Sequence, residues 1–191
     1  MPRFSYWLEV IEQKMNFSLR LNHPEWQDVL RINKGTILQK GRHGLYHEMI
    51  LATQSVKQKF GCYSWESDSI IYYIGSFAQD YARGDFKTNL QGRIHNYLQN
   101  HRIYKTGRKN TNLFVFESIN KAVEQNDMSL RVLKFESLEI NDEWIDFDAF
   151  SKDSNLVHSV ESLLICCYRM QEQCKWNRAY NASGGSYVNR P

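Results

Sequence analysis

The sequence predicts an α+β fold in which a small antiparallel three-stranded sheet is flanked by helices and preceded by a mixed N-terminal extension. Two β-prone runs, at 61–65 and 70–74, are separated by a short polar segment, which is typical of a hairpin. Residues 130–138 alternate apolar and polar side chains and predict the third strand. Apolar residues recur at helical spacing between and after these strands, which favours the α+β class.

The hairpin is the most clearly patterned part of the chain. Its turn is expected in the polar run 66–69, and Gly75 is expected to end its second strand. The acidic residues of 139–154 predict a loop between the third strand and the last helix.

The helices are predicted from apolar spacing and capping residues. Leu90 and Ile94 lie on one face of a helix at about 88–100, and Asn112 can cap a second helix at about 113–126. The sequence further predicts helices at about 24–33, 45–59 and 155–174.

Composition excludes several classes of protein. The chain has 191 residues, of which 42% are hydrophobic and 24% charged, so it is neither disordered nor a repeat fibre. Its four cysteines include an adjacent pair and no C-x-x-C, so we expect reduced thiols packed as small apolar side chains. No apolar stretch approaches about 18 residues and the N-terminus lacks a signal-peptide pattern, so we expect a soluble, cytoplasmic protein without a membrane partner.

We expect three regions along the chain. Residues 1–58 form an N-terminal extension. Residues 59–180 form the main domain, with a basic insertion around 100–127, and residues 181–191 form a loose, flexible tail.

Two tripeptides of the hairpin carry the main functional signal. Gly61-Cys62-Tyr63 is followed ten residues later by Tyr73-Ile74-Gly75, with one tripeptide on each strand. Tyr63 and Tyr73 stand at even spacing, so a regular hairpin brings their side chains to one face. In the next predicted helix, Arg93 and Tyr97 are one helical turn apart and share a face.

These residues resemble the signature of the GIY-YIG nucleases, with a cysteine at the middle position of the first tripeptide. The family also has a metal-binding Glu on a later helix, which Glu161 matches, and a following Asn, which Asn177 matches. The resemblance covers roughly residues 60–178. It implies a Mg²⁺-dependent or Mn²⁺-dependent nuclease with catalytic residues Tyr63, Tyr73, Arg93, Tyr97, Glu161 and Asn177.

The same residue types suit phosphodiester hydrolysis on chemical grounds. Arg93 can clamp a phosphate through two parallel hydrogen bonds. A tyrosine with an ordinary pKa of about 10 is a poor base at neutral pH, so a neighbouring cation or a metal-bound water would have to lower the pKa of Tyr63 or share its proton. A single carboxylate such as Glu161 suits Mg²⁺, which keeps most of its waters and takes phosphate oxygens as further ligands.

Basic side chains gather in two segments that we expect to contact DNA. Mixtures of Lys, Arg, His and Asn serve both phosphate contacts and base-edge recognition. The candidates are Lys34, Lys40, Arg42, His43, Arg102, Lys105, Arg108, Lys109 and Asn110.

The leading hypothesis is a sequence-specific double-strand DNA endonuclease of the type II restriction class, acting as a homodimer on a two-fold site. Residues 59–180 would be its nuclease domain, and residues 1–58 would contact DNA or the second subunit. One alternative is a standalone repair or branched-DNA endonuclease. A second is a non-catalytic DNA-binding module with the same fold. A third is a structural or interaction protein that carries the Tyr-Ile-Gly tripeptide by chance, without salt-dependent DNA affinity.

Overall fold

A computed structural model gives the fold of most of the chain. It describes residues 19–36, 52–53, 56, 58, 60–78, 89–99 and 111–177. For residues 19, 95–99 and 111–113 it describes the backbone alone.

The predicted hairpin is confirmed. Strands β3 (Phe60–Ser67) and β4 (Ile70–Ala78) pair antiparallel. The two residues between them, Asp68 and Ser69, have φ of 49° and 65°, as the tight hairpin turns that match strand twist require. Gly75 does not end the second strand as expected, because β4 continues through it to Ala78.

A four-stranded sheet contains this hairpin, in the order β2-β5-β3-β4. Strand β5 (Met128–Lys134) pairs with β3, and β2 (Glu25–Ile32) pairs with β5, all antiparallel. The helix expected at 24–33 is therefore wrong. Proline is tolerated where a strand begins, and here Pro24 directly precedes β2, whose partner β5 lies about one hundred residues further along the chain.

A second sheet has three strands in the order β1-β6-β7. Its strands are β1 (Leu19–Asn22), β6 (Ser137–Ile140) and β7 (Glu143–Asp146). The single strand expected at 130–138 is thus two strands, separated at Phe135, whose side chain is buried against Phe147 and Phe150. The acidic loop expected at 139–154 is also wrong, because it holds the β6–β7 hairpin and the short helix α5 (Phe147–Phe150).

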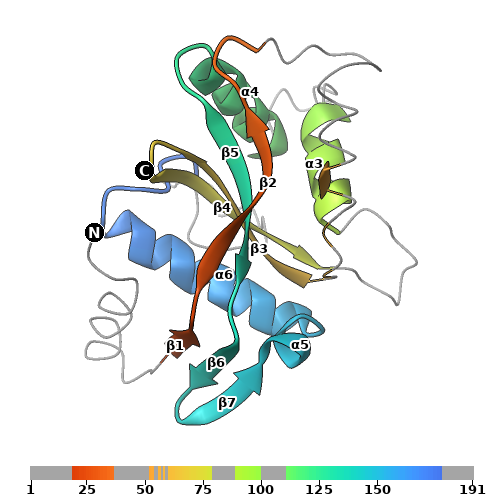
Figure 1. Cartoon of the computed structure of the whole chain (residues 1–191), viewed down its shortest axis with the longest axis vertical. Helices are drawn as coiled ribbons and strands as arrows, with labels where there is room; N and C mark the ends of the chain where they lie inside the picture. Colours follow the sequence, from red (N-terminus) through yellow and green to blue (C-terminus); the bar gives the residue numbers. More distant parts are fainter. Residues whose placement is uncertain are drawn as a thin grey trace, which may run out of the picture.

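Three longer helices cover the four-stranded sheet, which twists so that the β3–β4 hairpin crosses the direction of β2 and β5 (Figure 1). Helices α3 (Leu90–Gln99) and α4 (Thr111–Val123) confirm the helices expected at 88–100 and 113–126, but α4 begins before Asn112, which is not its cap. Helix α6 (Ser154–Arg169), capped by Asp153, ends before the expected residue 174. Of the helix expected at 45–59, residues 52–53 are helical, 56 and 58 are not, and the rest lies outside the described residues.

The two faces of the β3–β4 hairpin pack against different helices. Cys62 and Ile74 lie in a core with the apolar side of α6. Tyr63 and Phe77 lie in a second core with α3 and α4. Neighbouring residues of one strand point to opposite faces, which explains why adjacent residues enter different cores.

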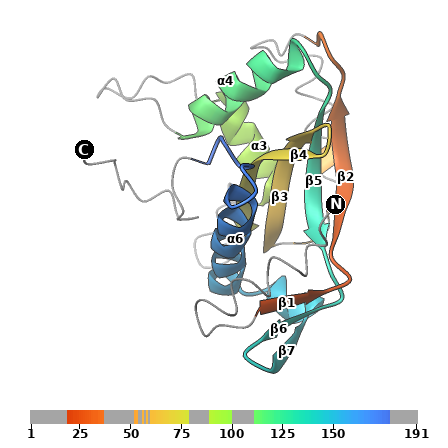
Figure 2. The same ribbon diagram turned by 90° about the vertical axis from the view of Figure 1, so that its left-hand side faces the viewer.

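The protein is therefore an α+β structure with two antiparallel sheets. The three-stranded sheet lies at one end of the molecule and α4 at the other (Figure 2). Strands β1 and β2 lie within the expected extension 1–58. Each of them pairs with a strand from the second half of the chain, β1 with β6 and β2 with β5. Among the helices of the described ranges, none has both the length and the apolar character to cross a membrane.

Candidate active site

Tyr63 reaches across the hairpin onto the outer strand β4. It stands directly opposite Gly75, and only 1% of its surface is exposed. A Cβ atom at Gly75 would lie 2.5 Å from both Cζ and Oη of Tyr63. The glycine therefore provides the space in which the tyrosine hydroxyl rests.

Tyr73 lies beside Tyr63 on the same face of the hairpin. The two rings are 6.1 Å apart between centroids and inclined by 49°, and both belong to the core under α3 and α4. This confirms that the two tyrosine side chains share a face. Tyr73 is half-buried, whereas Tyr63 is fully buried.

Arg93 is held in the first turn of α3. The side chain of Asn89 accepts a hydrogen bond from the Gly92 amide at 2.7 Å, which caps the helix. Leu90 and Ile94 are buried and anchor the helix to the sheet. The Nε atom of Arg93 is buried and has no hydrogen-bond partner among the described residues. Tyr97 belongs to the same helix, and its side chain lies outside the described residues.

Glu161 lies on the opposite face of the hairpin, on the side of α6 that packs against the sheet. Only 3% of its surface is exposed, and its Oε2 atom has no hydrogen-bond partner within the described part of the chain. The nearby Cys62 thiol points at the Val157 carbonyl instead, at 3.8 Å. Burial, and then the charge of Glu161, raise the pKa of Cys62 well above its ordinary value, so this thiol stays protonated.

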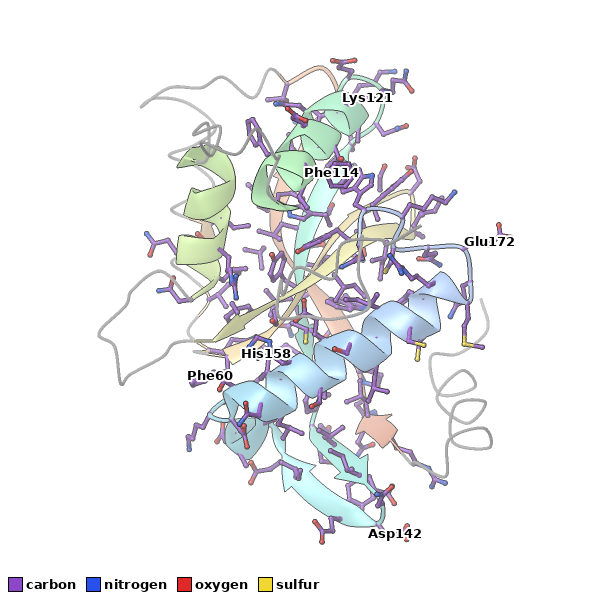
Figure 3. All side chains as sticks on the ribbon, turned by 180° about the vertical axis from the view of Figure 1, so that it is seen from behind. Phe60, Phe114, Lys121, Asp142, His158 and Glu172 are labelled. Carbon is purple, nitrogen blue, oxygen red and sulfur yellow. The ribbon has the colours of Figure 1, made fainter. Side chains whose placement is uncertain are left out.

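His158 is a member of this cluster that sequence reasoning missed. Its Nδ1 atom is 2.9 Å from the Ser76 hydroxyl and 3.6 Å from Glu161 Oε2. Figure 3 shows His158 on the side of α6 that faces the hairpin. The three-residue spacing from Glu161 was a signal, because residues three apart share a helix face. The contact with Ser76 depends on tertiary packing.

Asn177 binds the backbone of the outer strand. Its side chain accepts a hydrogen bond from the Ile74 amide at 2.9 Å and donates one to the Ile74 carbonyl at 2.7 Å. The amides of Cys174 and Trp176 donate to carbonyls earlier in β4. The segment that follows α6 thus covers the edge of β4 up to Ile74, one residue before Gly75.

The expected catalytic residues approach β4 from both faces of the sheet. Tyr63, Tyr73 and helix α3 lie on one face, and Glu161 lies on the other. They can meet only around the edge of β4, which is the outermost strand. At Gly75 and Ser76 of this strand, the Tyr63 hydroxyl lies on one face, and His158 contacts Ser76 on the other.

The carboxylate of Glu161 fits a divalent cation. A buried carboxylate oxygen without a hydrogen-bond donor is costly unless it is paired or coordinates a metal. Carboxylate oxygen is also the ligand type that Mg²⁺ and Mn²⁺ prefer. Within the described ranges, no group of three or more His, Cys, Asp or Glu side chains gathers as a ligand cluster.

Of the residues expected to contact DNA, the structure describes one. Lys34 has an exposed side chain, and its amide donates to Asp127 at 2.8 Å, which fixes the turn after β2. The remaining candidates lie outside the described residues: Lys40, Arg42, His43, Arg102, Lys105, Arg108, Lys109 and Asn110.

Comparisons with known proteins assign no family to the chain. No family model matches it, and no curated protein or solved structure matches it either. Function is therefore inferred from the side chains that meet around β4.

Proposed function

We propose that the protein is a divalent-metal-dependent endonuclease that cuts both strands of DNA at a specific sequence. One observation carries the proposal: the buried acid Glu161 and the half-buried Arg93, each with a buried polar atom unpartnered among the described residues, stand on two helices that pack against β4. The Glu161 oxygen needs a cation, and the Arg93 N–H group needs an anion. A metal ion bound to a phosphate group would supply both. The resemblance to the GIY-YIG nucleases supports the same assignment.

Arg93 binds the scissile phosphate in this proposal. Its vacant Nε–H donates to a phosphate oxygen, and its fixed positive charge stabilises the additional negative charge of the pentacoordinate transition state. Because Asn89, Leu90 and Ile94 already hold the first turn of α3, little reorganisation accompanies binding.

Tyr63 acts as the base in its tyrosinate form: Oη takes the proton of the attacking water and becomes the neutral phenol, which returns that proton to solvent after the cut. The water oxygen forms a bond to phosphorus, the bond to the leaving oxygen breaks, and that oxygen takes up a proton from solvent. A cation that comes close to Tyr63 in the DNA complex, such as Arg93, would favour the tyrosinate. Tyr73 and Tyr97 contribute further hydroxyls, and Asn177 keeps β4 in place through Ile74.

Glu161 binds the metal in this proposal. A divalent cation there would supply Lewis-acid stabilisation to the phosphate oxygens. The buried position of Glu161 keeps competing water and lysine side chains away from the carboxylate.

The basic segments supply the DNA contacts. Lys34 and the candidates between 40 and 43 and between 102 and 110 neutralise phosphates and read base edges. A two-fold dimer places one catalytic centre on each strand of a palindromic site, which gives double-strand cleavage.

A cleavage assay with matched variants tests the proposal. Unmethylated phage and plasmid DNA are incubated with the purified protein and either Mg²⁺ or EDTA. Discrete metal-dependent fragments that share one short end sequence are expected, and Glu161→Gln and Arg93→Ala should each abolish them. Glu161→Gln should unfold at the same temperature as the wild type or a higher one, because it removes a buried charge.

Tyr63→Phe and Tyr73→Phe separate the two tyrosines. Loss of the Tyr63 hydroxyl should lower the cleavage rate by at least about 100-fold, as expected for removal of a general base. Loss of the Tyr73 hydroxyl should have a smaller effect. Full activity of Tyr63→Phe would refute its role, and cleavage restricted to flaps or junctions would replace the restriction assignment with a branched-DNA enzyme.

A further inference from the structure

His158 is an ionisable side chain beside Glu161 that the proposed mechanism leaves without a role. The two residues are three apart on α6, and the distance between Nδ1 and Oε2 is 3.6 Å. The same Nδ1 atom lies 2.9 Å from Oγ of Ser76 on β4. Ser76 is only 4% exposed, so the imidazole is tied to a buried point of the strand.

The arrangement determines which nitrogen carries the proton. A bare Nδ1 lone pair would face the negative carboxylate at 3.6 Å, which is repulsive, whereas an Nδ1–H group is attracted to it. An Nδ1–H group can also donate to the Ser76 hydroxyl, which is 2.9 Å away. The ring thus presents the positive end of an N–H dipole to Glu161.

The other neighbours of Glu161 do not provide this contact. The Cys62 thiol points at the Val157 carbonyl, and Glu161 Oε2 has no hydrogen-bond partner among the described residues. Within the described part of the chain, His158 is therefore the partner placed to restrain the carboxylate, and it is itself restrained by Ser76 on β4.

We propose that His158 is a positioning residue, which holds the Glu161 carboxylate ready for a divalent cation while Ser76 holds the imidazole. The inference rests on the proposed metal-binding role of Glu161. Residues that hold a metal-binding side chain in place typically contribute 10-fold to 100-fold in metal affinity, because they prevent that side chain from rotating away. The imidazole cannot itself bind the cation through Nδ1, because that nitrogen carries the proton.

Metal binding to the full chain tests the inference without relying on activity. Mn²⁺ affinity is measured by electron paramagnetic resonance of the free ion, with Mg²⁺ competition. Glu161→Ala should abolish binding, and His158→Ala should weaken it about 10-fold. His158→Asn, whose amide stands near the Nδ1 position, should stay within about 3-fold of the wild type. His158→Gln, whose amide stands near the Nε2 position, should behave like His158→Ala.

Two further variants separate positioning from general stability. Ser159→Ala changes the exposed neighbour of His158, whose hydroxyl only donates to the Asn155 carbonyl, and should leave Mn²⁺ affinity unchanged. Ser76→Ala removes the hydroxyl that holds the His158 ring and should weaken Mn²⁺ binding, as His158→Ala does. It should add little in the His158→Ala background, because the two residues act as one unit. Ser76→Ala also serves if His158→Ala fails to fold.

The possible outcomes distinguish this inference from the nuclease proposal. Mn²⁺ binding that depends on Glu161 and His158 in a chain that cleaves no DNA would support the positioning role and refute the nuclease. Unchanged affinity in His158→Ala, or equal affinities in His158→Asn and His158→Gln, would overturn the positioning role whether or not DNA is cut. A wild-type chain that binds no Mn²⁺ would overturn it as well.

Discussion

Gly75 is required by its neighbour across the hairpin and not by its own backbone. It lies within a regular strand, opposite Tyr63. The ring of Tyr63 occupies the volume that any larger side chain would need. A glycine normally weakens a strand, and here a cross-strand aromatic ring covers it.

Gly75→Ala should therefore destabilise the protein by about 1–3 kcal/mol, the usual cost of overpacking a core. It should also lower the cleavage rate, because the Tyr63 hydroxyl must move. Urea denaturation measures the first effect and the plasmid assay the second.

A double-mutant cycle provides the control for this prediction. In a Tyr63→Ala background the added methyl group no longer meets a ring, so the stability cost of Gly75→Ala should largely vanish. An equal cost in both backgrounds would contradict the steric explanation.

At the scale of elements, the segment after α6 completes the sheet edge. Outer strands carry unpaired backbone groups that invite association with other chains. Between Ile71 and Ile74 these groups are paired with residues 173–177. Glu172 and Cys174 adopt φ of 60° and 55°, which turns the chain out of the helix and along the strand.

Asn177→Ala should remove both contacts to the backbone of Ile74. Two buried polar groups then lose their partners, and we expect a loss of about 2–4 kcal/mol in the free energy of unfolding. The denaturation midpoint in urea should fall with an unchanged slope. Lys175→Ala, an exposed neighbour, should change stability by less than about 0.5 kcal/mol.

A network of charges ties together the three strands β2, β5 and β3. Arg131 lies between Asp28 and Glu66, with 2.6 Å between its Nη1 and Glu66 Oε1. Burial raises the pKa of the Glu66 carboxyl above its ordinary 4.5, although Arg131 opposes the shift. Folded Glu66 therefore holds its proton at a higher pH than the unfolded chain does.

Stability should consequently depend on pH through Glu66. Above pH 4.5 the native state binds more protons at this site than the unfolded state, so its contribution falls as pH rises. As the pH rises from 4.5 to 7, the unfolding free energy of the wild type should fall relative to that of Glu66→Gln. Thermal unfolding at several pH values measures it, and a constant difference would contradict the raised pKa.

The whole molecule depends on its N-terminal strands. Ile32 of β2 is 1% exposed and belongs to the core around Tyr63, and β1 is an outer strand of the second sheet. Strand β2 pairs with one edge of β5, and β1 pairs with one edge of β6. Without them, the backbone N–H and C=O groups along these edges would lose their hydrogen-bond partners.

A chain of residues 37–191 should therefore show no cooperative unfolding transition. Scanning calorimetry makes the measurement, and a chain of residues 19–191, which keeps both strands, controls for shortening. A transition of 37–191 at the temperature of the full chain would show that β1 and β2 are dispensable.

Local patterns in the sequence determined the hairpin, the helices α3 and α4, and the α+β class. In each case the signal is short-range: two β-prone runs around a polar turn, or apolar residues at helical spacing. The same patterns predicted that Tyr63 and Tyr73 share a face, because that property follows from strand geometry alone.

Only the tertiary structure decided the remaining features. Strand β2 follows a proline that equally suits the start of a helix, and its partner β5 lies about one hundred residues away. The split of 130–138 into two strands depends on burial of Phe135 against Phe147 and Phe150. Long-range packing brings α6 and the segment after it against the hairpin, which places Cys62 of β3 near Glu161, Ser76 of β4 against His158, and Ile74 of β4 against Asn177.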